Sequence, residues 1–234
     1  MRGYVGQTRS AKLTERLRSL GIGEATQPDE WPPRRTPYFL DNGAFKLWTS
    51  GQPFNEERFM RIVERVDSEG PRPEFIVAPD KVANPESLEY SLSWLARLQG
   101  VAPLALVVQD GMTQQQVESA MRKGFSVLFV GGSLEWKFKT APDWVRLAKR
   151  LGVPCHIGRI GTRGRARWAR EIGADSVDSC TPLFSEGNLN RWLEGMNDEY
   201  QANMFGPPTP KANQLNIVRK NKRGKDEGDD QQVV

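Results

Sequence analysis

The chain has 234 residues, enough to bury one substantial core, and its 33 Lys and Arg against 29 Asp and Glu leave a formal net charge of +4. Two cysteines and one histidine cannot supply the four ligands of a Cys/His zinc site, and Cys155 and Cys180 indicate no disulfide framework. No apolar run approaches the roughly 20 residues of a membrane span, and the first residues lack the apolar core of a signal peptide. We therefore expect a soluble, cytoplasmic protein that works away from membranes.

Short apolar runs alternate along the chain with amphipathic stretches, the pattern of successive strand and helix units. The runs predict seven strands, at residues 3–5, 38–40, 75–78, 104–108, 127–130, 155–157 and 176–177. Helices are expected at residues 11–20, ending at Gly21, and after Asn55, Asn84, Thr113 and Thr140. This order predicts an α/β barrel that is irregular or trimmed, because no eighth strand is visible.

The composition of the chain changes after residue 197. Residues 1–197 are expected to form the barrel, and residues 198–234 a linker and a charged tail. Gly206 to Pro210 is typical of a linker, and a basic run from Lys220 precedes an acidic run that ends at Asp230. A solvated tail is the favoured interpretation, and a basic arm that touches nucleic acid is the alternative.

Four polar residues stand where predicted strands end: Asp41, Asp80, Gln109 and Asp178. The carboxyl ends of parallel strands meet at one rim of a barrel, where such enzymes build their active sites. Two carboxylates at one rim can divide nucleophilic and acid/base work, so Asp41 and Asp178 are the candidate catalytic pair. Each alone could instead cap a helix, but no helix is expected to begin directly after Asp41. The set indicates an enzyme.

The neighbouring residues suggest a flat, base-like ligand with phosphates. Asp80 and Gln109 offer a carboxylate and an amide, which suit the edge of a purine-like ring. The small residues from Gly131 to Ser133 would let a ring approach the backbone, although the double glycine could also cradle a phosphate. A P-loop is not indicated, because no Lys-Ser/Thr pair follows.

Five arginines lie between residues 158 and 170 and are placed to hold phosphates. Arg159 and Arg163, expected in a loop, are the stronger candidates, and Arg165 follows them; a solvated helix face could account for some of this cluster. His156 lies within an apolar strand, and we expect it to be packed or to support a catalytic group rather than act as a base.

Six motifs, in order between residues 38 and 180, resemble those of the tRNA-guanine transglycosylase superfamily. The similarity is greater to its shortened DNA-directed branch, the DpdA-type 7-deazaguanine transglycosylases of phages and bacteria. The motifs are Asp41-Asn42-Gly43-Ala44-Phe45, Ala78-Pro79-Asp80, Val108-Gln109-Asp110-Gly111, Val130-Gly131-Gly132-Ser133, Ile157-Gly158 and Val177-Asp178-Ser179-Cys180. Asp110 replaces a glycine of the family, and Ser133 stands where an apolar residue is usual.

The resemblance implies a TIM-type (β/α)8 barrel, in the host cytoplasm if a phage encodes it, that replaces guanine in DNA with a free 7-deazaguanine base such as 7-cyano-7-deazaguanine. It implies Asp178 as nucleophile, Asp41 as general acid/base and no cofactor or metal. The implied base-binding residues are Phe45, Asn42, Asp80, Gln109, Gly131, Gly132, Ser133, Ile157 and Gly158, and Arg159, Arg163 and Arg165 would hold phosphates.

The zinc subdomain of the tRNA-acting members is missing from this sequence, which favours DNA over RNA as the partner. Modification of RNA, a hydrolytic base glycosidase and an inactive nucleic-acid-binding subunit remain alternatives. The sequence leaves the oligomeric state open.

Overall fold

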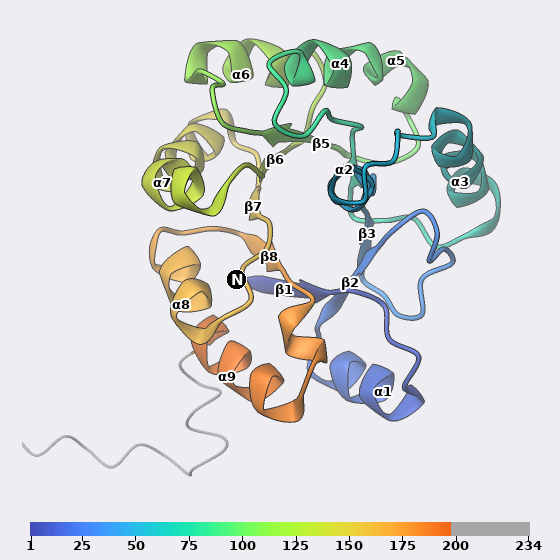
Figure 1. Cartoon of the computed structure of the whole chain (residues 1–234), viewed down its shortest axis with the longest axis vertical. Coiled ribbons are helices and arrows are strands. Elements are labelled where there is room, and N and C mark those ends of the chain that lie inside the picture. The colour runs from blue at the N-terminus through green and yellow to red at the C-terminus, as the bar shows by residue number, and fades with distance from the viewer. Residues whose placement is uncertain (198–234) are drawn as a thin grey trace, which may run out of the picture.

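Eight parallel strands, paired in chain order, close into a barrel inside a ring of helices (Figure 1). The computed structural model describes residues 1–197, so the predicted linker and charged tail at 198–234 lie outside the described residues. The strands are β1 Arg2–Val5, β2 Gly23–Thr26, β3 Tyr38–Leu40, β4 Ile76–Val77, β5 Leu104–Val108, β6 Val127–Val130, β7 Cys155–Ile157 and β8 Ser176–Asp178. The ring closes where β1 pairs with β8, with Arg2 opposite Ser176 and Tyr4 opposite Asp178. The fold is a TIM-type (β/α)8 barrel, as predicted.

Helices follow every strand except β2. They are α1 Ala11–Ser19, α2 Ala44–Thr49, α3 Glu56–Glu69, α4 Ser87–Ser93, α5 Leu95–Leu98, α6 Gln114–Met121, α7 Leu134–Leu151, α8 Arg163–Glu171 and α9 Glu186–Met196, with a 3₁₀ turn, η1, at Thr181–Leu183. In Figure 1, α2 lies inside the ring formed by the other helices, next to β3. Within residues 1–197, no helix combines the length and apolar character that crossing a membrane requires.

Two predicted helix starts are confirmed and two are wrong. Asn55 caps α3, and Thr113 begins α6 with a reciprocal capping box. Asn84 does not cap a helix; its side chain accepts a hydrogen bond from the backbone of Glu86, and α4 begins only at Ser87. The helix expected after Thr140 begins earlier, at Leu134, so Thr140 lies inside it.

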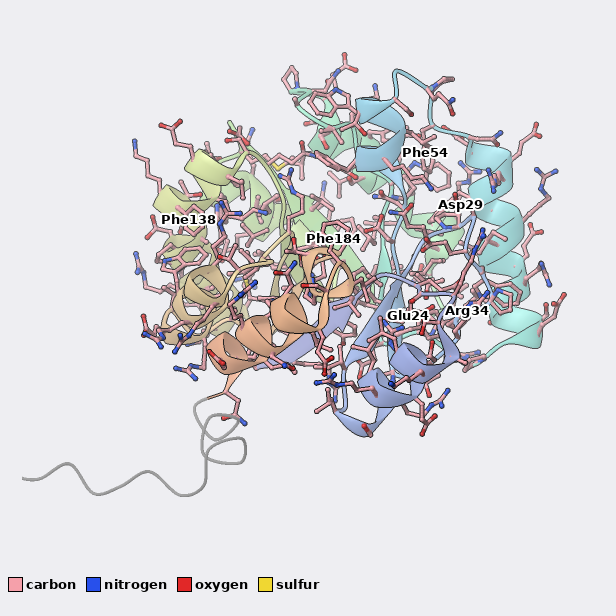
Figure 2. The ribbon with its side chains drawn as sticks, turned by 60° about the horizontal axis from the view of Figure 1, so that its bottom comes forward. Glu24, Asp29, Arg34, Phe54, Phe138 and Phe184 are labelled. Atoms are coloured by element: carbon pink, nitrogen blue, oxygen red, sulfur yellow. The ribbon has the colours of Figure 1, made fainter. Side chains whose placement is uncertain are left out.

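The eighth strand, β2, was missed because it carries a buried ion pair where an apolar residue would be expected. Glu24 and Arg35 are both fully buried and lie 3.0 Å apart, from Glu24 Oε2 to Arg35 Nη1. Arg35 also donates to the backbone carbonyls of Val5 and Gly23. The backbone N–H of Arg34 donates to the Glu24 carboxylate, and Figure 2 labels these two residues. The loop at residues 27–37 thus covers β2 with polar contacts in place of a helix.

Alternate residues along the strands separate the core into two layers. Side chains that point into the barrel pack against one another: Tyr4, Phe39, Phe75, Val77, Ala105, Val107, Val127 and Phe129. Phe39 stacks on Phe75 with ring centroids 4.7 Å apart. The intervening residues, such as Leu40 and Ile157, pack outward against the helices. This alternation determines which strand residues can reach the barrel mouth.

The last helix, α9, secures the closure between the first and last strands. Trp192 is fully buried, and its indole N–H donates to the carbonyl of Ile160 at 2.6 Å. A side chain at Gly3 of β1 would overlap the Trp192 ring. Gly195 lets α9 approach the backbone of α8 at Arg163 in the same way. Glycine at both positions therefore allows the close packing that closes the ring.

Candidate active site

The carboxyl ends of the strands bring most of the predicted site residues to one rim. Asp41 directly follows β3, Asp80 follows β4, Gln109 follows β5, and Gly131 follows β6. Asp178 is the last residue of β8. The parallel topology places these polar groups at one end of the barrel.

Asp178 is held by only one of its two carboxylate oxygens. Its Oδ1 lies within hydrogen-bond distance of the imidazole Nε2 of His156, at 3.0 Å, and accepts from the backbone N–H of Arg159 at 3.3 Å. Within residues 1–197, Oδ2 has no hydrogen-bond partner, and the Asp178 side chain is 19% exposed. A carboxylate fixed in this way has one oxygen left for reaction.

Asp41 has a very different environment. Its Oδ1 accepts a hydrogen bond from the backbone N–H of Gly43 at 2.6 Å. Burial, together with the charges of Asp178, Asp80 and Glu30, raises the pKa of Asp41 to about 7. At neutral pH this carboxyl group can both hold and release a proton, as a general acid/base must.

Helix α2 begins at Ala44, shortly after Asp41, but its N-cap is Gly43 and no side chain caps it, so Asp41 caps no helix, as expected. Gly43 precedes α2 in the left-handed conformation, with φ of 75°. One oxygen of Asp41 therefore orders the turn that leads into α2 without capping the helix. The hydrogen bond from Gly43 uses Oδ1, and the pKa of Asp41 stays raised despite it.

Asp80, Asn42 and Gln109 form one buried hydrogen-bonded unit across β3, β4 and β5. The Asn42 amide donates to Asp80 Oδ1 at 2.7 Å, and the Gln109 amide donates to Asp80 Oδ2 at 2.5 Å. The Gln109 carbonyl accepts from the backbone N–H of Ala83 at 2.9 Å. Burial raises the pKa of Asp80 to about 6, against the opposing effect of the Asn42 hydrogen bond. The two amides thus fix the orientation of the Asp80 carboxylate.

Asp110 and Ser133, which differ from the motifs that the sequence otherwise resembles, contact each other. The Asp110 carboxylate accepts hydrogen bonds of 2.8 Å from both the backbone N–H and the hydroxyl of Ser133. Ser133 also caps α7. A side chain at Gly132, whose φ is 70°, would come within 2.6 Å of Asp110, and one at Gly131 within 2.7 Å of Val107. The double glycine therefore lets the loop after β6 pack closely against the end of β5.

Arg159 and Phe45 meet across the barrel mouth from the ends of β7 and β3. The Arg159 guanidinium lies over the Phe45 ring at 4.3 Å from its centroid and donates to the carbonyl of Gly132. Arg159 has a φ of 61°, in the left-handed region that glycine favours. Phe45 remains 44% exposed. A cation and an aromatic face thus lie together at the entrance.

Arg163 and Arg165 are not brought to the same place. Arg163 was expected in a loop, but it is the first residue of α8. Its guanidinium pairs with the Glu194 carboxylate of α9 at 3.2 Å. The Arg165 guanidinium lies 5.7 Å from the centre of the Phe138 ring on α7. Arg159 is the one of the three predicted phosphate ligands that contacts Asp178.

Ile157 and Gly158, both predicted to bind the base, lie in different surroundings. Ile157 is fully buried in the outer layer against the helices. A side chain at Gly158 would lie 2.8 Å from the Phe129 ring and 3.3 Å from Asp178 Oδ1. Glycine at this position therefore allows the end of β7 to pass close to the Asp178 carboxylate.

Sequence reasoning missed Lys137 and the contact between His156 and Asp178. Lys137 is fully buried, and its ammonium group donates to the carbonyl of Gly158. Burial and the nearby Arg159 charge lower the pKa of Lys137 to about 7. Lys137 lies four residues before the buried Ala141, and this helical spacing could have indicated that Lys137 faces the core. His156 alternates with Ile157 along its strand, and this alternation could have indicated that His156 points into the barrel.

A scan against models of known protein families finds no match for this chain, and a search among curated proteins also finds none. The function proposed below therefore rests on the geometry of the rim and on the six ordered motifs.

Proposed function

We propose that the protein is a transglycosylase that replaces guanine in DNA with a 7-deazaguanine. The observation that carries this proposal is the unequal pair of carboxyl groups at the rim. Asp178 has one oxygen held and one free, whereas burial raises the pKa of Asp41 to about 7. A free carboxylate oxygen suits a nucleophile, and a carboxyl group that titrates near neutrality suits proton transfer.

In the first half-reaction, Oδ2 of Asp178 attacks C1′ of the target deoxyguanosine, and the bond from C1′ to N9 breaks. Asp41 supplies a proton to the departing guanine, so that a neutral base leaves. In the second half-reaction, Asp41 takes a proton from the incoming 7-deazaguanine, whose N9 attacks C1′ and displaces Asp178. In each step one bond to C1′ forms as another breaks, and the proton that Asp41 gives up in the first step is regained in the second. The nearby carboxylate stabilises the oxocarbenium-like centre.

The base would bind above the buried unit of Asp80, Asn42 and Gln109. The two amides hold both oxygens of Asp80, so its remaining lone pairs are oriented for an N–H edge of guanine. Phe45 offers a partly exposed aromatic face for stacking. A target nucleotide within a duplex would have to be extruded before its sugar could reach a barrel mouth, and Arg159 would then bind a flanking phosphate.

The test follows guanine release and base incorporation with labelled duplex DNA and, in parallel, with tRNA, each supplied with 7-cyano-7-deazaguanine. Exchange in DNA is the expected result. Exchange in tRNA alone would support the proposed reaction but show that the substrate is RNA and not DNA. Release of base without incorporation would identify a hydrolase. No reaction with either polymer, while nucleic acid still binds, would favour a binding subunit and overturn the proposal.

Asp178→Asn tests the nucleophile directly. The variant should no longer form a covalent adduct with DNA but should bind it with nearly unchanged affinity, because the amide keeps the shape of the side chain. Asp67→Asn, which changes an exposed carboxylate on α3, is the matched control and should form the adduct normally. Adduct formation by Asp178→Asn at the wild-type rate would exclude Asp178 as nucleophile.

Changing Arg163 and Arg165 together to alanine tests whether α8 contacts the polymer. If both arginines neutralise phosphates of duplex DNA, the slope of log affinity against log salt should fall by about 1.8. Arg122→Ala, following α6, serves as the control for a lost surface charge. An unchanged slope would mean that these two arginines act only within the protein.

A further inference from the structure

The imidazole of His156 joins Asp178 to Ser176 inside the barrel. Nδ1 lies 2.8 Å from the Ser176 hydroxyl, and Nε2 lies 3.0 Å from Asp178 Oδ1. His156 is opposite Ser176 in the pairing of β7 with β8, and Ser176 and Asp178 point to the same face of β8 because they are two residues apart. The strand register thus places both partners of the imidazole.

Aromatic rings surround this imidazole and fix its plane. The nearest ring centroid, that of Phe129, is 4.4 Å away, and those of Phe39 and Phe75 are 5.2 and 5.6 Å away. Tyr4 also contacts the imidazole but directs its hydroxyl to Glu74. His156 is fully buried, so these neighbours leave the imidazole no room to turn away from Asp178.

We propose that His156 is a positioning residue, which holds Asp178 by Oδ1 so that Oδ2 is presented to the anomeric carbon. An ionised carboxylate can only accept hydrogen bonds, so Nε2 must carry the proton that it donates to Asp178. In the neutral imidazole, Nδ1 then accepts from the Ser176 hydroxyl. The chain of donors runs from Ser176 through His156 to Asp178. This inference rests on the proposed function for its consequence in catalysis, but the proton arrangement stands independently.

The same contact serves both states of the nucleophile. When Oδ2 forms the bond to C1′, Oδ1 becomes the carbonyl oxygen of the resulting ester and can still accept from Nε2 and from the backbone of Arg159. The carboxylate therefore need not rotate between attack and release. Orientation of this kind is worth about a hundredfold in rate when a misplacement near 1 Å removes it.

Two substitutions separate positioning from packing. His156→Phe keeps an aromatic ring in the cage but removes the donor, and it should form the covalent adduct about a hundredfold more slowly while binding DNA normally. His156→Gln can place its amide N–H where Nε2–H lies, and it should recover most of that rate. A folded His156→Phe variant that forms the adduct as fast as the wild type would overturn the proposal.

The proton arrangement can be measured without any reaction, because the chain has one histidine. In protein with 15N-labelled histidine, the imidazole spectrum should show a protonated Nε2 and an unprotonated Nδ1 when the ring is neutral, and Asp178→Asn should shift the Nε2 signal. The opposite tautomer would overturn the proposal even if His156→Phe failed to fold. The expected tautomer in a wild-type protein that exchanges no base would instead refute only the proposed function.

Discussion

Replacing Asp41 with asparagine should stabilise the protein in a pH-dependent way. The substitution keeps the shape of the side chain and an oxygen that can accept from the Gly43 N–H, but it removes the titrating group. Burial raises the pKa of Asp41 from 3.8 to about 7, so the folded state disfavours its ionised form. Between these two values the folded state binds the proton more tightly than the unfolded state does. Stability from this group is therefore present below pH 4 and is lost as the pH rises through 7.

The magnitude follows from linkage between proton binding and folding. A pKa that rises from 3.8 to about 7 corresponds to a cost of about 4 kcal/mol at pH 8, where Asp41 is ionised in both states. At pH 4.5 the same calculation leaves a cost of about 1 kcal/mol. The neutral amide of the Asp41→Asn variant carries no such cost, so the variant should exceed the wild type in stability by these amounts while losing base exchange.

The assay is urea unfolding of both proteins at several pH values from 4.5 to 8. The difference in the free energy of unfolding should widen steadily as the pH rises. Asp67→Asn, at an exposed position on α3, provides a control in which burial of the carboxylate plays no part. A difference between Asp41→Asn and the wild type that stays constant across this range would refute the assignment of a raised pKa to Asp41.

Two further predictions concern the fold. Gly195→Ala should destabilise the protein by about 1–3 kcal/mol or more, because the new Cβ would overlap a carbonyl oxygen of α8. Gly187→Ala, in the first turn of the same helix, meets no atom closer than 3.9 Å and should stabilise by up to about 1 kcal/mol in urea unfolding; equal effects would contradict the packing described for α9. Glu24→Gln should cost about 3–5 kcal/mol because it leaves Arg35 buried without its counter-charge. The exposed Glu186→Gln should change stability by less than about 1 kcal/mol, and a similar small loss at Glu24 would show that water reaches the buried pair.

The barrel was predictable because most strands are apolar runs followed by amphipathic helices, two of which begin at the predicted N-caps Asn55 and Thr113. β2 escaped detection because its four residues, Gly23–Thr26, form no apolar run, and Glu24 within it is buried by pairing with Arg35 in the loop that follows. The start of α7 was misplaced for a related reason. Ser133 is predicted to belong to a ring-binding loop, and the sequence does not reveal that its hydroxyl also caps the helix and donates to Asp110.

The sequence predicted where the site residues lie in the barrel, but not which residues they contact. Strand ends predicted that Asp41, Asp80, Gln109 and Asp178 would share a rim, because parallel strands all end there. Which partners each side chain would take depends on the barrel's register, which the sequence does not state. The contact between His156 and Asp178 is set by the pairing of β7 with β8, and it is known only once the register of these two strands is known.

The pairing of β1 with β8 also has a consequence during protein synthesis. Strand β1 leaves the ribosome before the other strands of the barrel, but its partner β8 begins only at Ser176, and Trp192 of α9 packs over Gly3 later still. The amino-terminal strand must therefore wait, with one edge unpaired, while nearly the whole barrel is translated. An unpaired strand edge is a template for wrong pairing. Ribosome-bound chains stalled before α9 should thus be the stage most exposed to misassembly and most dependent on chaperones.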